Sequence, residues 1–248
     1  MDRHHDAARL LLSARRDPAQ PLHSLPEAMR PRTEQQAYLV QRAIMSELGG
    51  IGGWKVGAPG PDGPISCAPL PMDGLQDSPG RSAAPLRGVE AEIGVRLATG
   101  LPPRTQPYAP EDVLAAIGSA HPIIEVLQSR YVDADAVDPL SNLADSLSHG
   151  GLVIGPAIPD WRQIDLATER VWLLIDGAEI RARTANPAGD MLRLLVWLAN
   201  TGAHWAGGLQ AGQVVTTGSW TGKDFAPAGA EVRAVFEHCG EAVVRFEA

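Results

Sequence analysis

The chain has 248 residues, of which 44% are hydrophobic and 20% charged, so it can bury a sizeable core as an ordinary globular protein. Its net charge of −8 and isoelectric point near 5.3 argue against a nucleic-acid partner, because phosphate binding needs a clustered basic surface. No run approaches the roughly 20 apolar residues of a membrane span. The 26 glycines and 21 prolines favour turns and short strands over a helical bundle.

The cysteine content and the first residues indicate the compartment. Cys67 and Cys239 are too few for a disulfide framework and lack the spacing of a metal site, so we expect free thiols in a reducing environment. Residues 1–16 carry basic residues around a short apolar run without a cleavage site, which does not fit a secretory signal. We therefore expect a soluble, cytoplasmic protein.

The N-terminal part reads as two helices, at 6–16 and 33–48, joined by a proline-rich connector. Thr33 is a favourable cap for the second helix, and the glycine pair at 49–50 ends it. From residue 52 the pattern changes to a short strand at 53–57. A segment rich in glycine, proline and serine follows at 58–86, which we expect to be a loop and a mobile lid.

The rest of the chain is mainly strands. Alternation predicts strands at 88–97 and 121–128 with a helix at 110–117 between them, and a hairpin of 170–176 and 178–183 turning at an Asp-Gly pair. An amphipathic helix is predicted at 188–201, then strands at 213–217, 231–237 and 242–246. This order lacks regular βαβ alternation and predicts an α+β fold, with a helical segment at 1–50 and a mixed, rolled β core at 51–248.

Two glutamates share one face of the strand at 88–97. Because side chains alternate, Val89 and Ala91 point to the core, whereas Glu90 and Glu92 lie together on the other face about 6–7 Å apart. One interpretation is a strand with a solvated polar face. The other is a metal site, since two buried carboxylates repel unless a cation lies between them and their hard oxygens suit Mg²⁺ or Mn²⁺.

Glu125 favours the second interpretation. In the strand at 121–128 its same-face neighbours Ile123 and Leu127 are apolar, and a carboxylate in such a row is costly unless it is paired or bound to a metal. The alternative is an ion pair with an arginine such as Arg130 or Arg87.

Several segments together resemble a known family. GWKVG at 53–57, RGVEAEIGVRL at 87–97, HPIIEVLQSRY at 121–131, LADSLSHGGLVIG at 143–155 and TTGSWTG at 216–222 follow in the order found in the hydratase/decarboxylase family of 2-keto-4-pentenoate hydratase and 4-oxalocrotonate decarboxylase, within the fumarylacetoacetate hydrolase fold. The resemblance runs nearly end to end. It implies N-terminal helices before a mixed β-roll core, Mg²⁺ or Mn²⁺ as cofactor, and a homo-oligomer.

The resemblance also implies site residues. Glu90, Glu92 and Glu125 match the metal-binding glutamates, and Lys55 matches the active-site lysine. Lys55 and Asp145 are our candidates for proton transfer, and we expect burial near a cation to lower the pKa of Lys55. For binding a small 2-oxo or 2-hydroxydienoate acid the candidates are Ser219, Thr221 and His149. The alternative is a plain turn at Ser219 and Thr221 and a solvated loop at His149.

Two positions depart from the family pattern. Ser146 stands where asparagine is usual, and His149 where a small residue is common.

The reaction that the resemblance implies is addition of water to a 2-hydroxy-2,4-dienoate, giving a 4-hydroxy-2-oxo acid in the catabolism of aromatic compounds. Decarboxylation of a 4-oxalocrotonate-type acid remains the alternative. An acylpyruvate-type hydrolase is less favoured, because the segment 58–86 has no histidine for a water-activating pair. The remaining alternative is a non-catalytic homologue that binds the metal without turnover.

Overall fold

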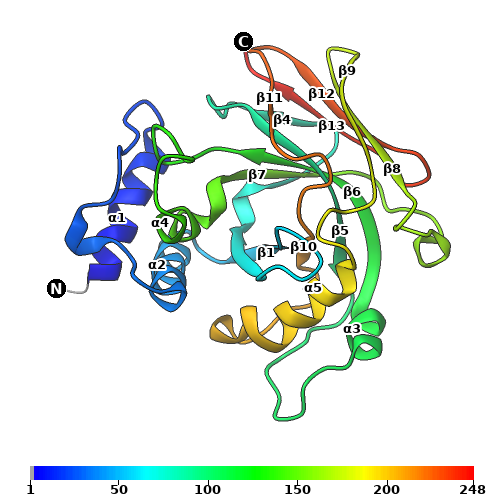
Figure 1. The fold of residues 1–248 in the computed structure, drawn as a ribbon, viewed down its shortest axis with the longest axis horizontal. Helices are drawn as coiled ribbons and strands as arrows, with labels where there is room; N and C mark the ends of the chain where they lie inside the picture. The colour runs from blue at the N-terminus through cyan, green and yellow to red at the C-terminus, as the bar shows by residue number, and fades with distance from the viewer. Residues whose placement is uncertain (1–2) are drawn as a thin grey trace.

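The computed structural model describes residues 3–248 and shows two β-sheets, with helices grouped at one side and at one end (Figure 1). The α-helices are α1 (Arg3–Arg16), α2 (Glu34–Glu47), α3 (Pro110–Ala116), α4 (Pro139–Ala144) and α5 (Met191–Trp197). Short 3-10 turns are η1 (Glu27–Met29), η2 (Met72–Gly74), η3 (Ser146–Ser148), η4 (Trp161–Gln163) and η6 (His204–Ala206), and the π-helical turn η5 (Leu198–Gly202) continues α5. No helix among these residues is long and apolar enough to cross a membrane.

The larger sheet has eight strands and carries the glutamates. Its order is β2-β1-β10-β5-β6-β7-β3, and β11 pairs separately with β5. The strands are β1 (Ile51–Gly57), β2 (Ser66–Pro71), β3 (Leu75–Asp77), β5 (Gly88–Leu97), β6 (Ile117–Leu127), β7 (His149–Ile154), β10 (Val214–Thr216) and β11 (Asp224–Phe225). Parallel pairs, such as β1 with β10, occur beside antiparallel ones, such as β5 with β6, so the sheet is mixed.

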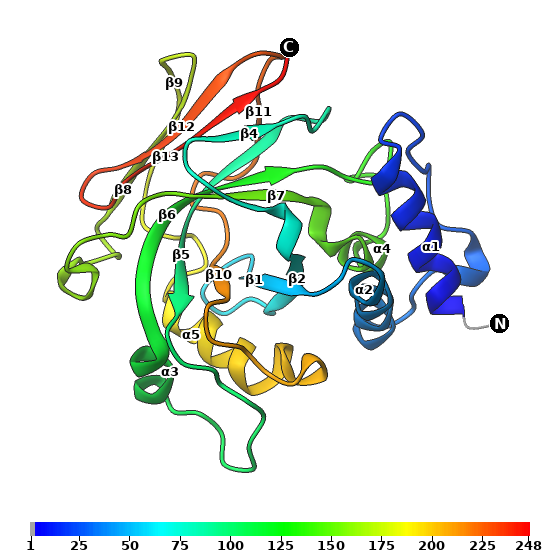
Figure 2. The same ribbon diagram turned by 180° about the vertical axis from the view of Figure 1, so that it is seen from behind.

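The second sheet has five strands in the order β4-β13-β12-β8-β9. They are β4 (Gly80–Ser82), β8 (Arg170–Ile175), β9 (Ala178–Thr184), β12 (Glu231–Phe236) and β13 (Gly240–Phe246). The long, curved β5–β6 pair runs from this sheet toward α3 and α5 at the opposite end (Figure 2). One core cluster joins the apolar row of β5 to inward residues of β8, β12 and β13 and to α5. The face of β5 that carries no glutamate is therefore the core face.

The N-terminal helices pack beside the larger sheet rather than on the second one (Figure 1). Their buried residues, among them Leu11, Val40 and Ile44, form a cluster with Tyr131 and Leu143 from the segment between β6 and β7. This contact matters for the site, because the same segment leads into β7. The chain passes from α2 to β1 at residue 50, where the sequence predicts a division into two parts, and that division stays a prediction.

The fold class and the principal elements are confirmed, with one correction. The segment 58–86, expected to be a loop and lid, contains β2, β3 and β4. The prolines of β2 misled the prediction. β2 is an edge strand that pairs only with β1, and an edge tolerates Pro69 and Pro71 because the missing N–H groups leave no partner unpaired. Cys67 and Cys239 are free, as expected, and both are buried.

Candidate metal centre

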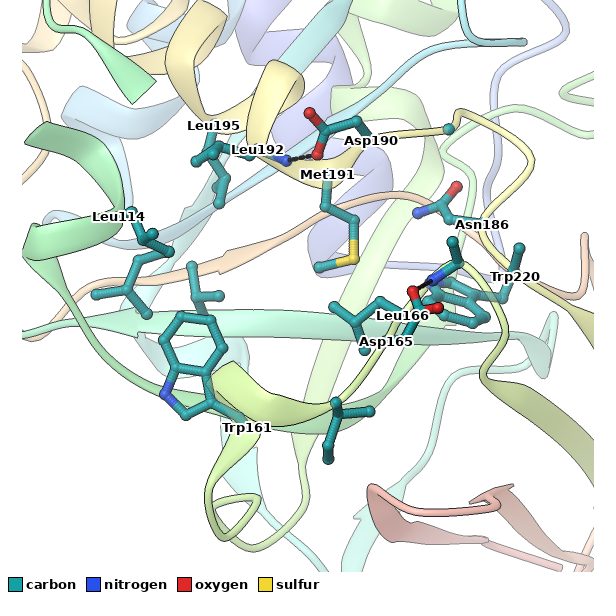
Figure 3. A pocket seen from close by; sticks show the side chains of 16 residues that line it. Leu114, Trp161, Asp165, Leu166, Asn186, Asp190, Met191, Leu192, Leu195 and Trp220 are labelled. Carbon is teal, nitrogen blue, oxygen red and sulfur yellow. Dashed lines mark hydrogen bonds between the residues drawn. The ribbon is translucent and has the colours of Figure 1, made fainter. Parts of the chain in front are cut away.

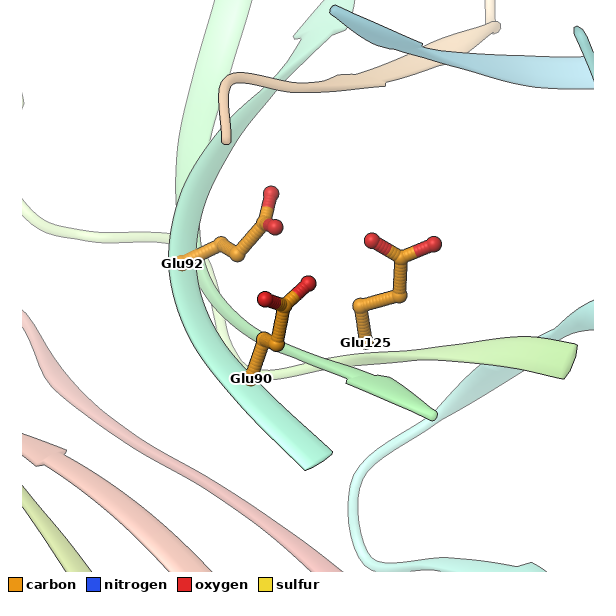
Figure 4. A group of neighbouring side chains, drawn as sticks. All are labelled: Glu90, Glu92 and Glu125. Atoms are coloured by element: carbon orange, nitrogen blue, oxygen red, sulfur yellow. The ribbon is translucent and has the colours of Figure 1, made fainter. Parts of the chain in front are cut away.

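Three carboxylates converge on one point of the larger sheet. Glu90 and Glu92 extend from β5 and Glu125 from β6, and one oxygen of each lies within 4.8 Å of the others (Figure 4). In the register of the two strands Glu90 is directly opposite Glu125. Glu92 and Glu125 are buried and Glu90 is half-buried, so the cluster opens toward solvent on the side of Glu90.

Glu125 is held through one of its two oxygens. Its Oε1 accepts a hydrogen bond from Lys55 Nζ at 2.8 Å and another from His149 Nδ1 at 2.9 Å. Its Oε2 is buried and has no hydrogen-bond partner. The arginines considered as partners from the sequence do not pair with it; Lys55 does. A buried carboxylate oxygen without a partner is costly unless something else satisfies it.

The other two glutamates are oriented by the segment after β10. Glu92 Oε2 accepts hydrogen bonds from the Thr216 hydroxyl and, at 3.0 Å, from the Gly218 backbone N–H. The Ser219 side chain lies near Glu90 and acts to lower the pKa of its carboxyl group. Sequence reasoning missed Thr216 and Gly218, although both belong to the TTGSWTG motif.

The order of the strands explains why these residues meet. Adjacent strands β1, β10, β5, β6 and β7 contribute, in that order, Lys55, Thr216, the glutamate pair, Glu125 and His149. Lys55 is level with Thr216 in the parallel pair of β1 and β10. A row of side chains on one sheet face thus becomes a single polar site, although its members come from distant parts of the sequence.

The residues fit a divalent cation. Three carboxylates and one ammonium have a net charge of −2 when all are ionised, which a divalent ion neutralises. Carboxylate oxygens are the ligands that Mg²⁺ and Mn²⁺ prefer. The unpartnered Oε2 of Glu125 supplies a free donor atom, and the hydrogen bonds to Oε1 fix that carboxylate in the way that outer partners fix metal ligands. The triad can therefore hold a divalent metal.

Without a cation, burial and mutual charge shift the pKa values of the three glutamates and of Lys55. Burial and the neighbouring carboxylate charges raise the pKa values of Glu90 and Glu92, with the larger effect on Glu92. Burial acts on Glu125 in the same direction, but Lys55 and His149 outweigh it and lower its pKa. For Lys55, burial lowers the pKa, as the sequence predicts, but the three carboxylates reverse the sign and the net pKa is raised. The lowered pKa expected for Lys55 applies to the site with a cation bound, and it stays a prediction, because this raised pKa is that of the site without one.

His149 lies beside the triad as a buried partner of Glu125 rather than on a solvated loop. Burial lowers its pKa although Glu125 opposes the shift, which favours a neutral ring that donates from Nδ1. Its Nε2 is buried without a hydrogen-bond partner and faces Gly74. This hydrogen bond orients the carboxylate of Glu125, and the expected contact of His149 with substrate stays a prediction.

Asp145, the second candidate for proton transfer, does not join the triad. Its buried carboxylate forms an ion pair with Arg130, whose guanidinium also donates to the His149 carbonyl at 2.6 Å. The next three residues, Ser146 to Ser148, have positive φ angles of 52°, 54° and 62°. This left-handed stretch turns the Leu147 carbonyl toward Lys55 Nζ, at 3.3 Å. Asp145 therefore anchors a backbone that contacts the catalytic candidate.

Ser219 and Thr221, the candidates for substrate binding, have different surroundings. Ser219 is half-buried near Glu90, and its hydroxyl accepts a hydrogen bond from the Gly222 N–H at 2.9 Å. The Thr221 hydroxyl is buried and accepts from the Ala91 N–H at 3.2 Å while donating to the Gly222 carbonyl at 3.0 Å. Thr221 thus holds the TTGSWTG motif against β5, and its hydroxyl already donates one hydrogen bond and accepts another.

A separate apolar cavity of about 500 Å³ lies on the core side of β5 (Figure 3). Trp161, Met191 and Trp220 line it together with Leu114. Val95, which also lines it, belongs to the row of β5 that faces away from the glutamates. None of the sequence-predicted site residues lines this cavity.

Comparison with known proteins places this arrangement in context. Residues 79–247 match the family model described as fumarylacetoacetate (FAA) hydrolase C-terminal. The chain is 29% identical over 232 residues, 86% of each protein, to 2-keto-4-pentenoate hydratase 2 of Dechloromonas aromatica (strain RCB). It is 28% identical over 134 residues to a 4-oxalocrotonate decarboxylase of Pseudomonas sp, an alignment that covers 53% of this chain and 50% of that one.

A solved structure has the same fold. The 4-oxalocrotonate decarboxylase from Pseudomonas putida G7, complexed with magnesium and adipate, superimposes with a TM-score of 0.84 over 98% of this chain and 97% of that one, at 23% identity. At that identity the likeness shows the fold. The family match includes both strands that carry the glutamates. The chain belongs to the fumarylacetoacetate hydrolase family.

Proposed function

We propose that the chain is a divalent-metal-dependent lyase that hydrates a 2-hydroxy-2,4-dienoate of the 2-keto-4-pentenoate type, giving a 4-hydroxy-2-oxo acid. The observation that carries the proposal is the Glu90–Glu92–Glu125 cluster, with an unpartnered oxygen on Glu125 and Lys55 beside it. The names of the relatives support the reaction class. Decarboxylation of a 4-oxalocrotonate-type acid is the second candidate, since one relative carries that name.

The three glutamates would hold Mg²⁺ or Mn²⁺. The bound cation supplies Lewis-acid stabilisation of negative charge on an oxygen of a chelating 2-oxo acid. Thr216 and Gly218 fix Glu92, and His149 fixes Glu125, so the donor atoms are positioned before anything binds. Glu90 is the least buried of the three glutamates, so the acid would enter on its side.

Lys55 is the group proposed to move the proton. Its side chain is 12% exposed and its Nζ is held by Glu125 Oε1 and the Leu147 carbonyl. With the carboxylate charge neutralised, burial is the remaining large influence on its pKa and acts to lower it, toward the range useful for general acid–base catalysis. Asp145 has no such part in the proposal, because Arg130 occupies its carboxylate.

The test is turnover with defined substrates. Purified protein with Mg²⁺ should remove the dienol absorbance of 2-hydroxypenta-2,4-dienoate and form 4-hydroxy-2-oxopentanoate; release of CO₂ from 4-oxalocrotonate would favour the decarboxylase instead. Lys55→Met should lower the rate by about 10²–10⁴-fold at saturating Mg²⁺, a condition that is needed because the variant also loses a hydrogen-bond partner of Glu125. If neither acid reacts and Glu92→Gln binds Mg²⁺ as the wild type does, the proposal is wrong.

The family resemblance also supports a homo-oligomer that works in the cytoplasm on a small-molecule acid. Light scattering coupled to size-exclusion chromatography measures the subunit number, and fractionation of the producing cells tests the compartment.

A further inference from the structure

A cavity of about 340 Å³ lies between the end of α1 and the segment that begins at β4. Its other walls come from η2 and from the adjoining ends of β6 and β7. Glu90, Glu92 and Glu125 do not line it, so it is separate from the metal centre. Its volume is at the lower end of the range of about 300–1,000 Å³ for small-molecule sites, which leaves room for a compact ligand.

The charged residues of this cavity are mostly arginines. Among the described residues it is lined by three arginines and one acid: Arg15, Arg81, Arg130 and Asp73. The charge of Arg130 is neutralised, since it forms an ion pair with Asp145. The other two arginines still outnumber the acid, although the whole chain has a net charge of −8. The cavity is therefore locally positive on an acidic protein.

The guanidinium groups of Arg15 and Arg81 have no hydrogen-bond or ion-pair partner within residues 3–248. Arg15 is half-buried, and burial together with the neighbouring charge of Arg130 lowers its pKa. The charges of Asp73 and Asp145 act on Arg15 in the opposite direction without outweighing this effect. A half-buried cation beside a second one is unfavourable unless an anion compensates it.

The backbone holds Arg81 at the cavity. The Gln76 side chain accepts a hydrogen bond from the Arg81 N–H and donates one to the Arg81 carbonyl, each at 2.8 Å. The Leu86 N–H donates to the Gln128 side chain at 2.9 Å and holds the other end of the same segment. Two fixed elements, α1 and the segment 81–86, thus present their unpaired arginines to one space.

We propose that this cavity binds a small molecule that carries a phosphate group, with Arg15 and Arg81 as its charged contacts. A phosphate dianion matches the charge of the two unpaired guanidinium groups. Arginine binds phosphate oxygens through parallel N–H donors, which makes it suited to this ligand. The site is distinct from that of the proposed reaction and does not depend on it.

The experiment is calorimetric titration of the metal-free protein with inorganic phosphate and with glycerol 3-phosphate, in chloride at constant ionic strength. Removing metal keeps the phosphate from binding through a cation at the glutamates. For the wild type we expect saturable binding, and the tighter of the two probes distinguishes free phosphate from a phosphate ester as the ligand. Arg15→Met and Arg81→Met should each weaken it at least about tenfold. Arg16→Met is the matched control, exposed and outside the cavity, and should bind as the wild type does.

Thermal unfolding separates lost binding from an altered fold. Methionine keeps the apolar stem of the side chain and Arg15 has no partner to lose, so Arg15→Met should be at least as stable as the wild type in chloride. Phosphate should raise the unfolding temperature of the wild type but not of Arg15→Met, because a ligand stabilises the protein that binds it.

Three results would overturn the inference. They are the absence of saturable binding of either probe to the wild type, wild-type affinity in both Arg15→Met and Arg81→Met, and a loss in Arg16→Met as large as that in Arg15→Met. The last result would mean that phosphate responds to the general charge of α1 rather than to the cavity. The reaction proposed for the metal centre is unaffected by all three.

Discussion

Glu90 and Glu125 are direct cross-strand partners in the register of β5 and β6, so a single backbone pairing sets the distance between two of the three candidate metal ligands. Each of these strands is paired on both sides within the larger sheet. The ligand geometry is consequently built into the most extensively paired part of the molecule, and it does not depend on a flexible loop closing over the cation.

Glu92→Gln should raise the stability of the metal-free protein and abolish its stabilisation by Mg²⁺. Burial and the carboxylates raise the pKa of Glu92 in the folded state above its unfolded value, so its ionised form opposes folding. The wild type without metal should therefore gain stability as the pH falls through the raised pKa, until the unfolded state is protonated too. This dependence should weaken in Glu92→Gln.

Thermal unfolding between pH 5 and 8, in EDTA and in Mg²⁺, measures these changes. About 1 kcal/mol corresponds to a shift of about 2–4 °C in a chain of this size. Glu179→Gln, at an exposed position of β9, serves as the matched control and should leave both the pH dependence and the Mg²⁺ effect unchanged. Retention of the full Mg²⁺ shift in Glu92→Gln would remove that residue from the ligand set.

His149→Ala should weaken metal binding by about 10–100-fold, the usual consequence of losing a partner that orients a ligand. The variant loses the Nδ1 donor to Glu125 Oε1 and leaves that oxygen with Lys55 as its remaining hydrogen-bond partner. Titration with Mn²⁺ followed by electron paramagnetic resonance gives the affinity directly. His149→Asn retains an amide donor near the same place and should recover part of the loss; equal affinities for the wild type and the alanine variant would exclude the orienting role.

Removing one member of the Arg130–Asp145 pair should destabilise the fold by about 3–5 kcal/mol, because the other charge is left buried without its partner. Arg130→Met and Asp145→Asn are the informative variants, measured by urea unfolding. The exposed pair of Arg104 and Asp112 provides the control, since its loss should change stability little. A normal free energy of unfolding combined with lost turnover in Asp145→Asn would instead return Asp145 to the catalytic candidates.

Ser146→Asn should stabilise the protein by a fraction of the roughly 1–2 kcal/mol that a left-handed residue costs. Ser146 has a φ angle of 52°, and asparagine adopts this region more readily than serine. The substitution restores the residue usual in the family pattern. Ser146→Ala should give no gain, because alanine has no polar group to favour the conformation. Differential scanning calorimetry of the two variants distinguishes this explanation from a loss of the Ser146 hydroxyl at this buried position.

Local patterns predicted much of the fold. Alternation alone predicted the strand at 88–97 and placed both glutamates on its polar face, and the Asp-Gly pair predicted the β8–β9 hairpin. The prediction of a loop at 58–86 was wrong because proline and glycine indicate a loop unless the strand is known to lie at the edge of a sheet. An edge position is a property of the sheet order, which short patterns do not contain.

The sequence by itself determined the α+β class and the carboxylate pair on β5. It also showed that Glu125, a charged residue in the apolar row of β6, needs an ion-pair partner or a metal. Only the tertiary structure decided that Lys55 and His149 share one oxygen of Glu125 and that Asp145 pairs with Arg130. The physical reason is the distance along the chain between the residues that interact. Alternation acts between neighbouring residues and is visible in the sequence, whereas ion pairs and hydrogen bonds across strands depend on which strands are adjacent and in what register.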